Sequence, residues 1–225
     1  MSDLQLVIGN CNYSSWSLRP WFFLAYHGVD FDVKRVSLFT ETMGKELEPY
    51  FSDGKVPVLR DGEIEIWDTL AILEYLVERY PELQGWPEDT RARAVARSVS
   101  AEMHSSFPDL RGEMPMNCRR RFVGFEPSQA ASRDIQRVSA IWRYCREQFG
   151  RNGPWLFGRF SVADCMFAPV VMRFVGYGIE LDETAGRYMD TLYNSHAART
   201  WVALGQAETE VIKEDEAPWP SEVIS

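Results

Sequence analysis

The sequence is short of the residues that build metal centres and redox pairs. Its 225 residues include four cysteines and three histidines, and Cys11, Cys118, Cys145 and Cys165 form no Cys-x-x-Cys pair. Structural zinc and iron–sulfur sites hold their cysteines at short, regular spacings. We therefore expect four free thiols, mostly buried as in a reducing compartment, and no metal centre.

Long apolar runs and an excess of positive charge are also missing. The most apolar stretches, 20–26 and 165–172, are far shorter than the ~20 residues that a membrane-spanning helix needs. Asp and Glu number 33 against 24 Lys and Arg, a net charge of −9 that repels phosphate backbones. The first ten residues, MSDLQLVIGN, lack the basic region and apolar core of a secretory signal. We expect a cytoplasmic protein with no nucleic-acid and no membrane partner.

The sequence is rich in the residues that form a core. Hydrophobic residues make up 45% of the chain and aromatic residues 13%, a composition typical of globular proteins. The length allows one large domain or two small ones. The hydrophobic pattern changes near residue 82, so we expect two domains, 1–81 and 91–225, with 82–90 as a linker that contains Gly85 and Pro87.

The first domain alternates strand and helix patterns. A turn at 60–62 joins two short strand patterns into a hairpin. The predicted order is βαβαββα, an α/β domain with an open mixed sheet. Strands are predicted at 4–8, 31–36, 56–59 and 63–67, and helices at 18–25, 43–51 and 70–80.

The second domain has helical periodicity throughout. One apolar stripe spans 92–107 and another spans 135–149, separated by an irregular stretch at 112–128. Ser161 and Asp164 have the spacing of a capping box, which predicts the start of a further helix. We expect shorter helices at 187–193 and 196–208, a solvent-facing arginine run at 119–121, and a tail from 214 that forms coil or frays.

Three segments of the first domain carry polar groups that could bind a ligand. Ser14, Ser15 and Ser17 lie where the first helix begins. A helix N-terminus presents free N–H donors and a partial positive charge, which lowers the pKa of a thiol held there. The alternative for this segment is that Ser14 or Ser15 is only an N-cap.

The other two segments contain a proline and an acidic pair. Pro57 lies inside an apparent strand, where it is either an ordinary trans proline at the strand start or a cis proline that exposes the Val56 backbone. Asp68 and Thr69 open the third helix, where backbone N–H groups bind a carboxylate and Asp68 can pair with an ammonium group. Helix capping alone would also explain this pair.

The order of these segments, together with the capping box of the second domain, resembles cytosolic glutathione transferases along nearly the whole chain. That family combines a thioredoxin-like domain with an all-helical domain. Residues 14–19, SSWSLR, are similar to the Ser-Ser-Cys-Ser-Trp-Arg run of zeta-type members, with Trp16 in place of the cysteine. We therefore identify the chain as a serine-type member (zeta-, tau- or theta-like) of bacterial type.

The resemblance implies that domain 1–81 binds glutathione as a co-substrate. Ser14 takes the position that stabilises the glutathione thiolate, with Ser15 as the second choice and Tyr13 a distant third. The remaining expected contacts are Val56 and Pro57 for the cysteinyl backbone, Asp68 and Thr69 for the γ-glutamyl group, and Lys55 near the ligand. No residue is assigned to the glycyl carboxylate.

The resemblance further implies that domain 91–225 binds the second substrate. Helical spacing places His104, Phe107 and Arg111 on one face, and with Met103 they would suit an apolar electrophile that carries a negative group. The alternative is that Met103 and Phe107 are core residues. The implied activity is conjugation of glutathione to an electrophile, as in detoxification, by a homodimer. A glutathione-dependent isomerase or lyase and a non-catalytic binding module remain alternatives.

Overall fold

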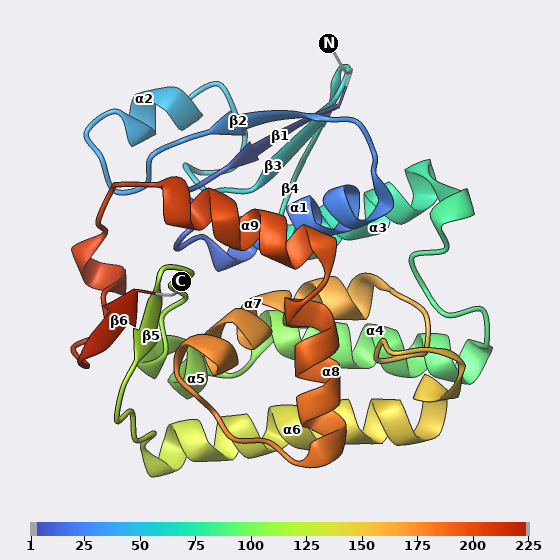
Figure 1. Ribbon diagram of the computed structural model, residues 1–225. Helices are drawn as coiled ribbons and strands as arrows, with labels where there is room; N and C mark the ends of the chain where they lie inside the picture. Colours follow the sequence, from blue (N-terminus) through green and yellow to red (C-terminus); the bar gives the residue numbers. More distant parts are fainter. Residues whose placement is uncertain (1–3, 224–225) are drawn as a thin grey trace.

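The computed structural model describes residues 4–223, which form a small sheet half and a larger helical half (Figure 1). The sheet has four strands in the order β2-β1-β3-β4, in which β1 is parallel to β2 and antiparallel to β3, and β3 is antiparallel to β4. The strands are β1 (Leu4–Ile8), β2 (Asp32–Arg35), β3 (Val58–Asp61) and β4 (Ile64–Trp67).

Helices cover both faces of this sheet. α1 (Ser15–His27) and α3 (Thr69–Arg79) pack on the face that joins the main core, and the short α2 (Met43–Leu47) packs on the other face (Figure 1). α1 ends at Gly28, whose φ of 64° gives the left-handed turn that glycine adopts without strain. The predicted βαβαββα order is confirmed.

The helical half is built around α7 (Val162–Gly176). Nearly every residue of α7 is buried, because α1 packs against it from the sheet half and α4 and α8 from the helical half. The other helices are α4 (Thr90–Ser105), α5 (Pro108–Glu113), α6 (Gln129–Phe149), α8 (Glu183–Tyr193) and α9 (His196–Ala207), with 3-10 turns η1 (Pro81–Leu83), η2 (Gly150–Asn152) and η3 (Lys213–Asp215).

Asp164, the aspartate of the predicted capping box, lies in the first turn of α7. The Asp164 carboxylate accepts the backbone N–H of Ser161 (2.8 Å), the Ser161 hydroxyl (3.0 Å) and the N–H of Leu156 (3.1 Å). Burial raises the pKa of Asp164 to about 6. This side chain therefore ties the loop before α7 to the first turn of the helix.

The apolar stripe predicted over 92–107 does not belong to one continuous helix. α4 ends at Ser105, and Phe107 has a φ of 66° before Pro108 opens α5. A residue before proline is disfavoured in the α-helical region, and proline has no N–H to continue the helix. His104 and Arg111 therefore lie on different helices.

Between residue 214 and Val223, the last residue described, the tail is more ordered than the sequence predicts. β6 (Ser221–Val223) pairs with β5 (Arg120–Phe122), so the tail is not simply coil. The prediction that residues 119–121 all face solvent is also wrong. Arg119 donates to the carbonyl oxygens of Glu208 (2.6 Å) and Glu210 (2.8 Å). This arginine holds the segment that follows α9.

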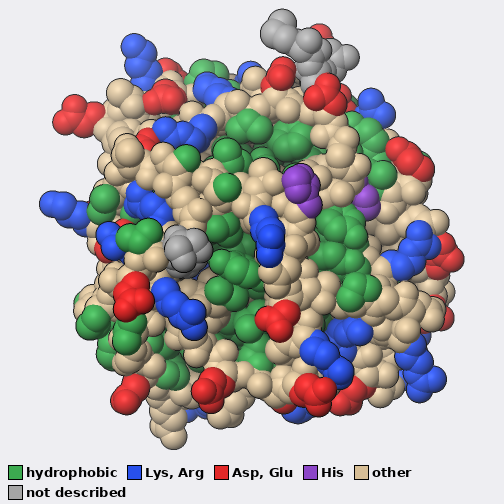
Figure 2. Space-filling view, in the orientation of Figure 1, with side chains coloured by type: hydrophobic (Ala, Val, Ile, Leu, Met, Phe, Trp, Pro, Cys, Tyr) green, Lys and Arg blue, Asp and Glu red, His purple; other side chains and the backbone are tan. Residues whose placement is uncertain are grey.

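The buried cysteines agree with an expectation drawn from composition. The four cysteines are free and buried. Among residues 4–223, no helix has the length and apolarity to cross a membrane. Acidic and basic side chains are interspersed on the face seen in Figure 2, which shows no broad basic patch.

Candidate functional site

A cavity of about 930 Å³ lies where β3 and β4 meet the first turns of α1 and α3. Both polar and aromatic side chains reach it. The five residues predicted to contact glutathione elsewhere than at its sulfur all take part in its wall. The lining residues are Trp16, Tyr50, Phe51, Ser52, Asp53, Lys55, Val56, Pro57, Trp67, Asp68 and Thr69.

The wall on the sheet side is formed by the segment before β3. The Val56–Pro57 peptide bond is cis, the second of the two alternatives that the sequence leaves open. Lys55 is exposed and pairs with Asp53 across 3.2 Å. This segment therefore presents a main-chain turn and one exposed cation to the cavity.

Asp68 lies at the start of α3, and its two carboxylate oxygens make different contacts. Oδ1 accepts the N–H groups of Leu70 (2.9 Å) and Ala71 (3.4 Å), so Asp68 is an N-cap. Oδ2 lies 3.3 Å from Nε2 of His104 on α4. Its side chain is about half exposed, so Oδ2 is also reachable from the cavity. The capping explanation is correct, and it leaves one oxygen for a ligand.

Thr69 connects the starts of α3 and α1. It is buried, and its hydroxyl donates to the carbonyl oxygen of Trp16 (3.2 Å). Because a hydroxyl has one hydrogen, Thr69 offers a ligand only an acceptor from its side chain in this conformation. Because Oδ1 of Asp68 already accepts the N–H groups of Leu70 and Ala71, the backbone N–H of Thr69 remains the donor for an anionic group at the start of α3.

The serines at the start of α1 differ in what their hydroxyls do. Ser14 is the N-cap: its Oγ accepts the N–H of Ser17 (3.4 Å) and donates to the Ser17 Oγ (2.7 Å). Ser17 in turn accepts the N–H of Gly9 (3.1 Å). The Ser15 hydroxyl takes no part in this chain of bonds and has no other partner within residues 4–223. Ser15 is thus freer to donate than Ser14, although neither lines the cavity.

Tyr13, the third choice for the sulfur contact, has a hydroxyl that is hydrogen-bonded to other residues. Its hydroxyl donates to Glu216 and accepts from Nη2 of Arg119 (2.7 Å). Burial, followed by the hydrogen bond to Glu216, raises the pKa of Tyr13. This tyrosine fastens the tail to the β1–α1 loop rather than facing the cavity.

Only part of the predicted electrophile site faces the cavity region. Met103 and Phe107 are 1% and 3% exposed and belong to the core. Helix α4 ends between them, at Ser105. His104 is half-buried beside Asp68. Arg111 donates to the carbonyl oxygens of Met103, His104 (3.3 Å) and Ser106 (3.0 Å), which fixes α5 against the end of α4.

Several residues of the site were not assigned from the sequence. Trp16 is 36% exposed, lines the cavity and packs edge-on against His104 with ring centroids 5.3 Å apart. Phe51 and Trp67 pack edge to face at 5.2 Å on the rim. The sequence did offer a signal for Trp16, because an aromatic residue stands there in place of the cysteine of the zeta-type run. The aromatic pair at 50–51, just before Lys55, was the sign for Phe51.

Comparison with known proteins places the chain in a family. The family model for the N-terminal domain of glutathione S-transferases matches residues 13–79, and the model for the C-terminal domain matches 128–193. Glutathione S-transferase 1 of Dianthus caryophyllus is 30% identical over 190 residues, which cover 80% of this chain and 81% of that protein. The chain belongs to the glutathione S-transferase family.

Other members of the family differ in chemistry while sharing the fold. A maleylacetoacetate isomerase of Rattus norvegicus is 32% identical over 182 residues, covering 75% of this chain and 77% of that protein. A glutathione transferase homologue from Burkholderia, solved with bound glutathione, superposes with a TM-score of 0.67 at 22% identity, covering 91% of this chain and 99% of its own. The predicted pairing of a thioredoxin-like domain with a helical domain is confirmed.

Proposed function

We propose that this glutathione S-transferase family member conjugates glutathione to an electrophile. The observation that carries the proposal is the cavity, which gathers Lys55, Val56, Pro57, Asp68 and Thr69 beside the start of α1. The fold itself brings residues 55–57 and 68–69 together, because Val58 pairs with Trp67 in the β3–β4 hairpin, but it does not require polar groups there, such as the Lys55 ammonium and the Asp68 carboxylate. Their convergence supports a preserved glutathione site rather than a degenerate binding module.

In this arrangement glutathione lies along the cavity with its sulfur toward the first turn of α1. The α-carboxylate of its γ-glutamyl group meets the N–H of Thr69 at the start of α3, and its ammonium group meets Oδ2 of Asp68. The Val56 main chain faces the cysteinyl backbone. The partial positive charge at the N-terminus of α1 and the Ser15 hydroxyl then lower the pKa of the thiol.

The chemistry requires a thiolate and a held electrophile. The thiol proton leaves to solvent, the sulfur lone pair forms a C–S bond, and a leaving group departs with its bonding pair or an activated double bond accepts the electrons. The protein contributes proximity and a stabilised negative charge, so no covalent enzyme intermediate is needed.

Binding of glutathione to Asp68→Asn tests the proposed site. Asparagine keeps an N-cap oxygen but removes the charge, so we expect Kd, measured by isothermal titration calorimetry, to rise about tenfold or more. Asp53→Asn is the matched control, because Asp53 also lines the cavity and carries the same charge. Equal affinities in all three proteins, or no binding by the wild type, would refute the proposed site.

A glutathione-dependent isomerase is the second candidate. It is supported by similarity to maleylacetoacetate isomerases of Caenorhabditis elegans and Pseudomonas aeruginosa, at 26% and 29% identity. Trp16, where the zeta-type run has cysteine, weighs against it. Product analysis separates the two functions, because a conjugate accumulates for a transferase and glutathione is regenerated by an isomerase.

We also propose that the protein acts as a homodimer in the cytoplasm. Four free, buried thiols are typical of a reducing compartment. Phe51 and Trp67 form an exposed apolar rim beside the cavity, of the kind that a second subunit covers.

A further inference from the structure

Three arginines lie close together behind the cavity, where α1, α5 and α7 meet. Arg19 and Arg173 are 1% and 7% exposed, and Arg111 is partly buried. None of the three forms an ion pair with a carboxylate within residues 4–223, and their hydrogen bonds reach main-chain carbonyl oxygens. Arg19 donates to Met166 (3.2 Å), and Arg173 donates to Met114 (2.7 Å) and Pro169 (3.1 Å).

Two polar atoms in this region have no partner. Nη1 of Arg19 and Nδ1 of His104 are buried, and neither forms a hydrogen bond within the described part of the chain. An unpaired buried polar atom costs about 1–3 kcal/mol, and more when it is charged. Nearly all buried polar atoms in proteins are paired, so an added acceptor within reach of Nη1 of Arg19 would be stabilised there.

The neighbouring carboxylates do not neutralise the arginines. Asp68 is near enough to raise the pKa of Arg19, but one of its oxygens caps α3 and the other faces His104. Asp134 accepts the N–H of Leu110 (3.0 Å). Burial, followed by repulsion from Arg111 and Arg173, lowers the pKa of Arg19. Asp134 near Arg111 and Asp215 near Arg173 offset part of this positive charge without forming an ion pair, so the region holds positive charge that is only partly compensated.

The Trp16 ring separates this charge from the cavity. The guanidinium carbon of Arg19 lies 4.5 Å from the ring centroid, and that of Arg111 lies 5.1 Å from it. The same ring lines the cavity. A cation–π contact stabilises a guanidinium by only about 0.5–2 kcal/mol. A carboxylate, which can accept two charge-assisted hydrogen bonds, is the better partner for Arg19 and Arg111.

We propose that Arg19 and Arg111, under the Trp16 ring, form a subsite for a carboxylate carried by the electrophile. The inference rests on the proposed transferase function and assigns its substrate class: an electrophile with a carboxylate a few bonds from the reacting carbon. Trp16 shifts aside when the carboxylate enters, and its ring then covers the apolar part of the substrate. Arg173 positions the subsite by holding the Met114 carbonyl at the end of α5.

A matched pair of substrates tests the subsite. In 4-chloro-3-nitrobenzoate and 4-chloro-3-nitrobenzamide the glutathione thiolate attacks the ring carbon that bears chlorine, a C–S bond forms, and chloride leaves with the bonding pair. The two compounds have nearly the same shape and differ in charge. We expect kcat/KM of the wild type, relative to the uncatalysed rate of each compound, to favour the benzoate by about tenfold or more.

Arg111→Met should remove that preference, which is a ratio of two rates and is therefore insensitive to a general loss of activity, and Arg111→Lys should retain part of it. Arg137→Met is the matched control, since it removes the same charge from an exposed ion pair with Glu102 on the helical half. Equal corrected rates for the two compounds in the wild type would overturn the proposal. So would a preference that survives in Arg111→Met.

Binding without glutathione separates this proposal from the transferase function. Calorimetric titration with 3-nitrobenzoate and 3-nitrobenzamide needs no turnover. Tighter binding of the benzoate to the wild type, lost in Arg111→Met and kept in Arg137→Met, supports the subsite even if no conjugate forms. Equal binding of both compounds to the wild type, or no binding of either, overturns the subsite while glutathione binding still tests the transferase.

Discussion

At the scale of single residues, the two neighbouring serines at the start of α1 have different roles. Ser14 uses its hydrogen for Ser17 and its lone pair for the helix N-terminus, whereas the Ser15 hydroxyl is not engaged within residues 4–223. A group that already donates cannot stabilise a thiolate without giving up its partner. Ser15 is therefore the better candidate for the sulfur contact, and Ser14 for shaping the helix start.

Ser15→Ala should raise the pKa of the bound glutathione thiol by about one unit, because one hydrogen bond to the thiolate is lost. The fraction of thiolate near neutral pH falls, so the rise of kcat/KM with pH moves to higher pH. Ultraviolet titration of the thiolate in the complex measures the shift.

Ser14→Ala provides the contrast. Loss of the N-cap should lower the free energy of unfolding by about 1 kcal/mol in urea denaturation while the thiol pKa changes little. If Ser14→Ala shifts the titration and Ser15→Ala does not, then Ser14 contacts the sulfur, as the sequence predicts, and Ser15 does not.

At this scale the sequence predicts identities better than orientations. A helix start and a proline within a strand are local signals that drew attention to Asp68, Thr69, Val56 and Pro57, and the family resemblance predicted their roles. The direction of each hydroxyl depends on neighbours from other segments, such as the Trp16 carbonyl beside Thr69, which is 53 residues away. Such contacts leave no pattern in the local sequence.

At the scale of elements, periodicity found most helices and failed where the backbone turns. The stripe over 92–107 has the right spacing for one helix, but Phe107 takes a positive φ before Pro108. Met103, on α4, and Phe107, at the N-cap of α5, are still both buried in the same core. Pro108 was the available sign, because proline favours the first turn of a helix.

The start of α7 gives a prediction about pH. The pKa of Asp164 is raised to about 6 in the folded protein by burial, above the ~3.9 of an unfolded chain. The folded state therefore binds more protons between these values, and this group stabilises the fold as pH falls from about 6 to 4. The contribution reaches about 2–3 kcal/mol.

Asp164→Asn should remove this contribution. It should also destabilise the fold at every pH, because the asparagine NH2 group would face a backbone N–H donor, that of Ser161 or Leu156, in place of a carboxylate oxygen. Urea denaturation of both proteins between pH 4 and 7 measures the difference in the free energy of unfolding. The difference should grow as pH falls. A difference that is constant over this range would mean that Asp164 keeps an ordinary pKa in the folded protein.

At the scale of the whole molecule, the exposed apolar rim predicts association. Phe51 is 79% exposed and contacts Trp67, so Phe51→Asp should shift a wild-type dimer toward monomer in sedimentation velocity. Phe39→Asp is the control, because Phe39 is 68% exposed and lies outside the cavity wall. A wild-type protein that sediments as a monomer at micromolar concentration would remove the proposed dimer.

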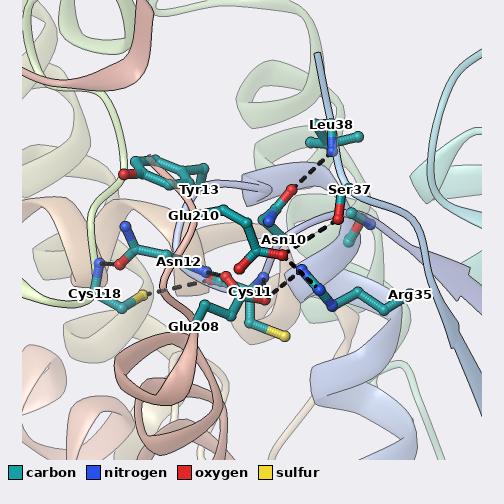
Figure 3. Close-up of polar contacts among 12 residues, drawn as sticks. Asn10, Cys11, Asn12, Tyr13, Arg35, Ser37, Leu38, Cys118, Glu208 and Glu210 are labelled. Carbon is teal, nitrogen blue, oxygen red and sulfur yellow. Dashed lines mark hydrogen bonds and ion pairs between the residues drawn. The ribbon is translucent and has the colours of Figure 1, made fainter. Parts of the chain in front are cut away.

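The two halves are also joined by the segment that follows α9, a connection that no local pattern indicates. The Glu208 carboxylate accepts the N–H groups of Cys11 (2.7 Å) and Asn12 (3.0 Å), almost 200 residues earlier in the chain (Figure 3). Arg35 lies 3.6 Å from the same carboxylate. One side chain thereby closes the loop from which α1, and with it the proposed sulfur site, begins.

Glu208→Ala should lower the free energy of unfolding by about 1–3 kcal/mol, because two partly buried N–H groups lose their acceptor. Glu210→Ala is the matched control. It removes a bond to the same Arg35 at 2.6 Å, but in a more exposed position where ion pairs contribute less than about 1 kcal/mol. Urea denaturation measures both. Equal losses would show that charge near Arg35, and not the capping of the β1–α1 loop, joins the tail to the sheet half.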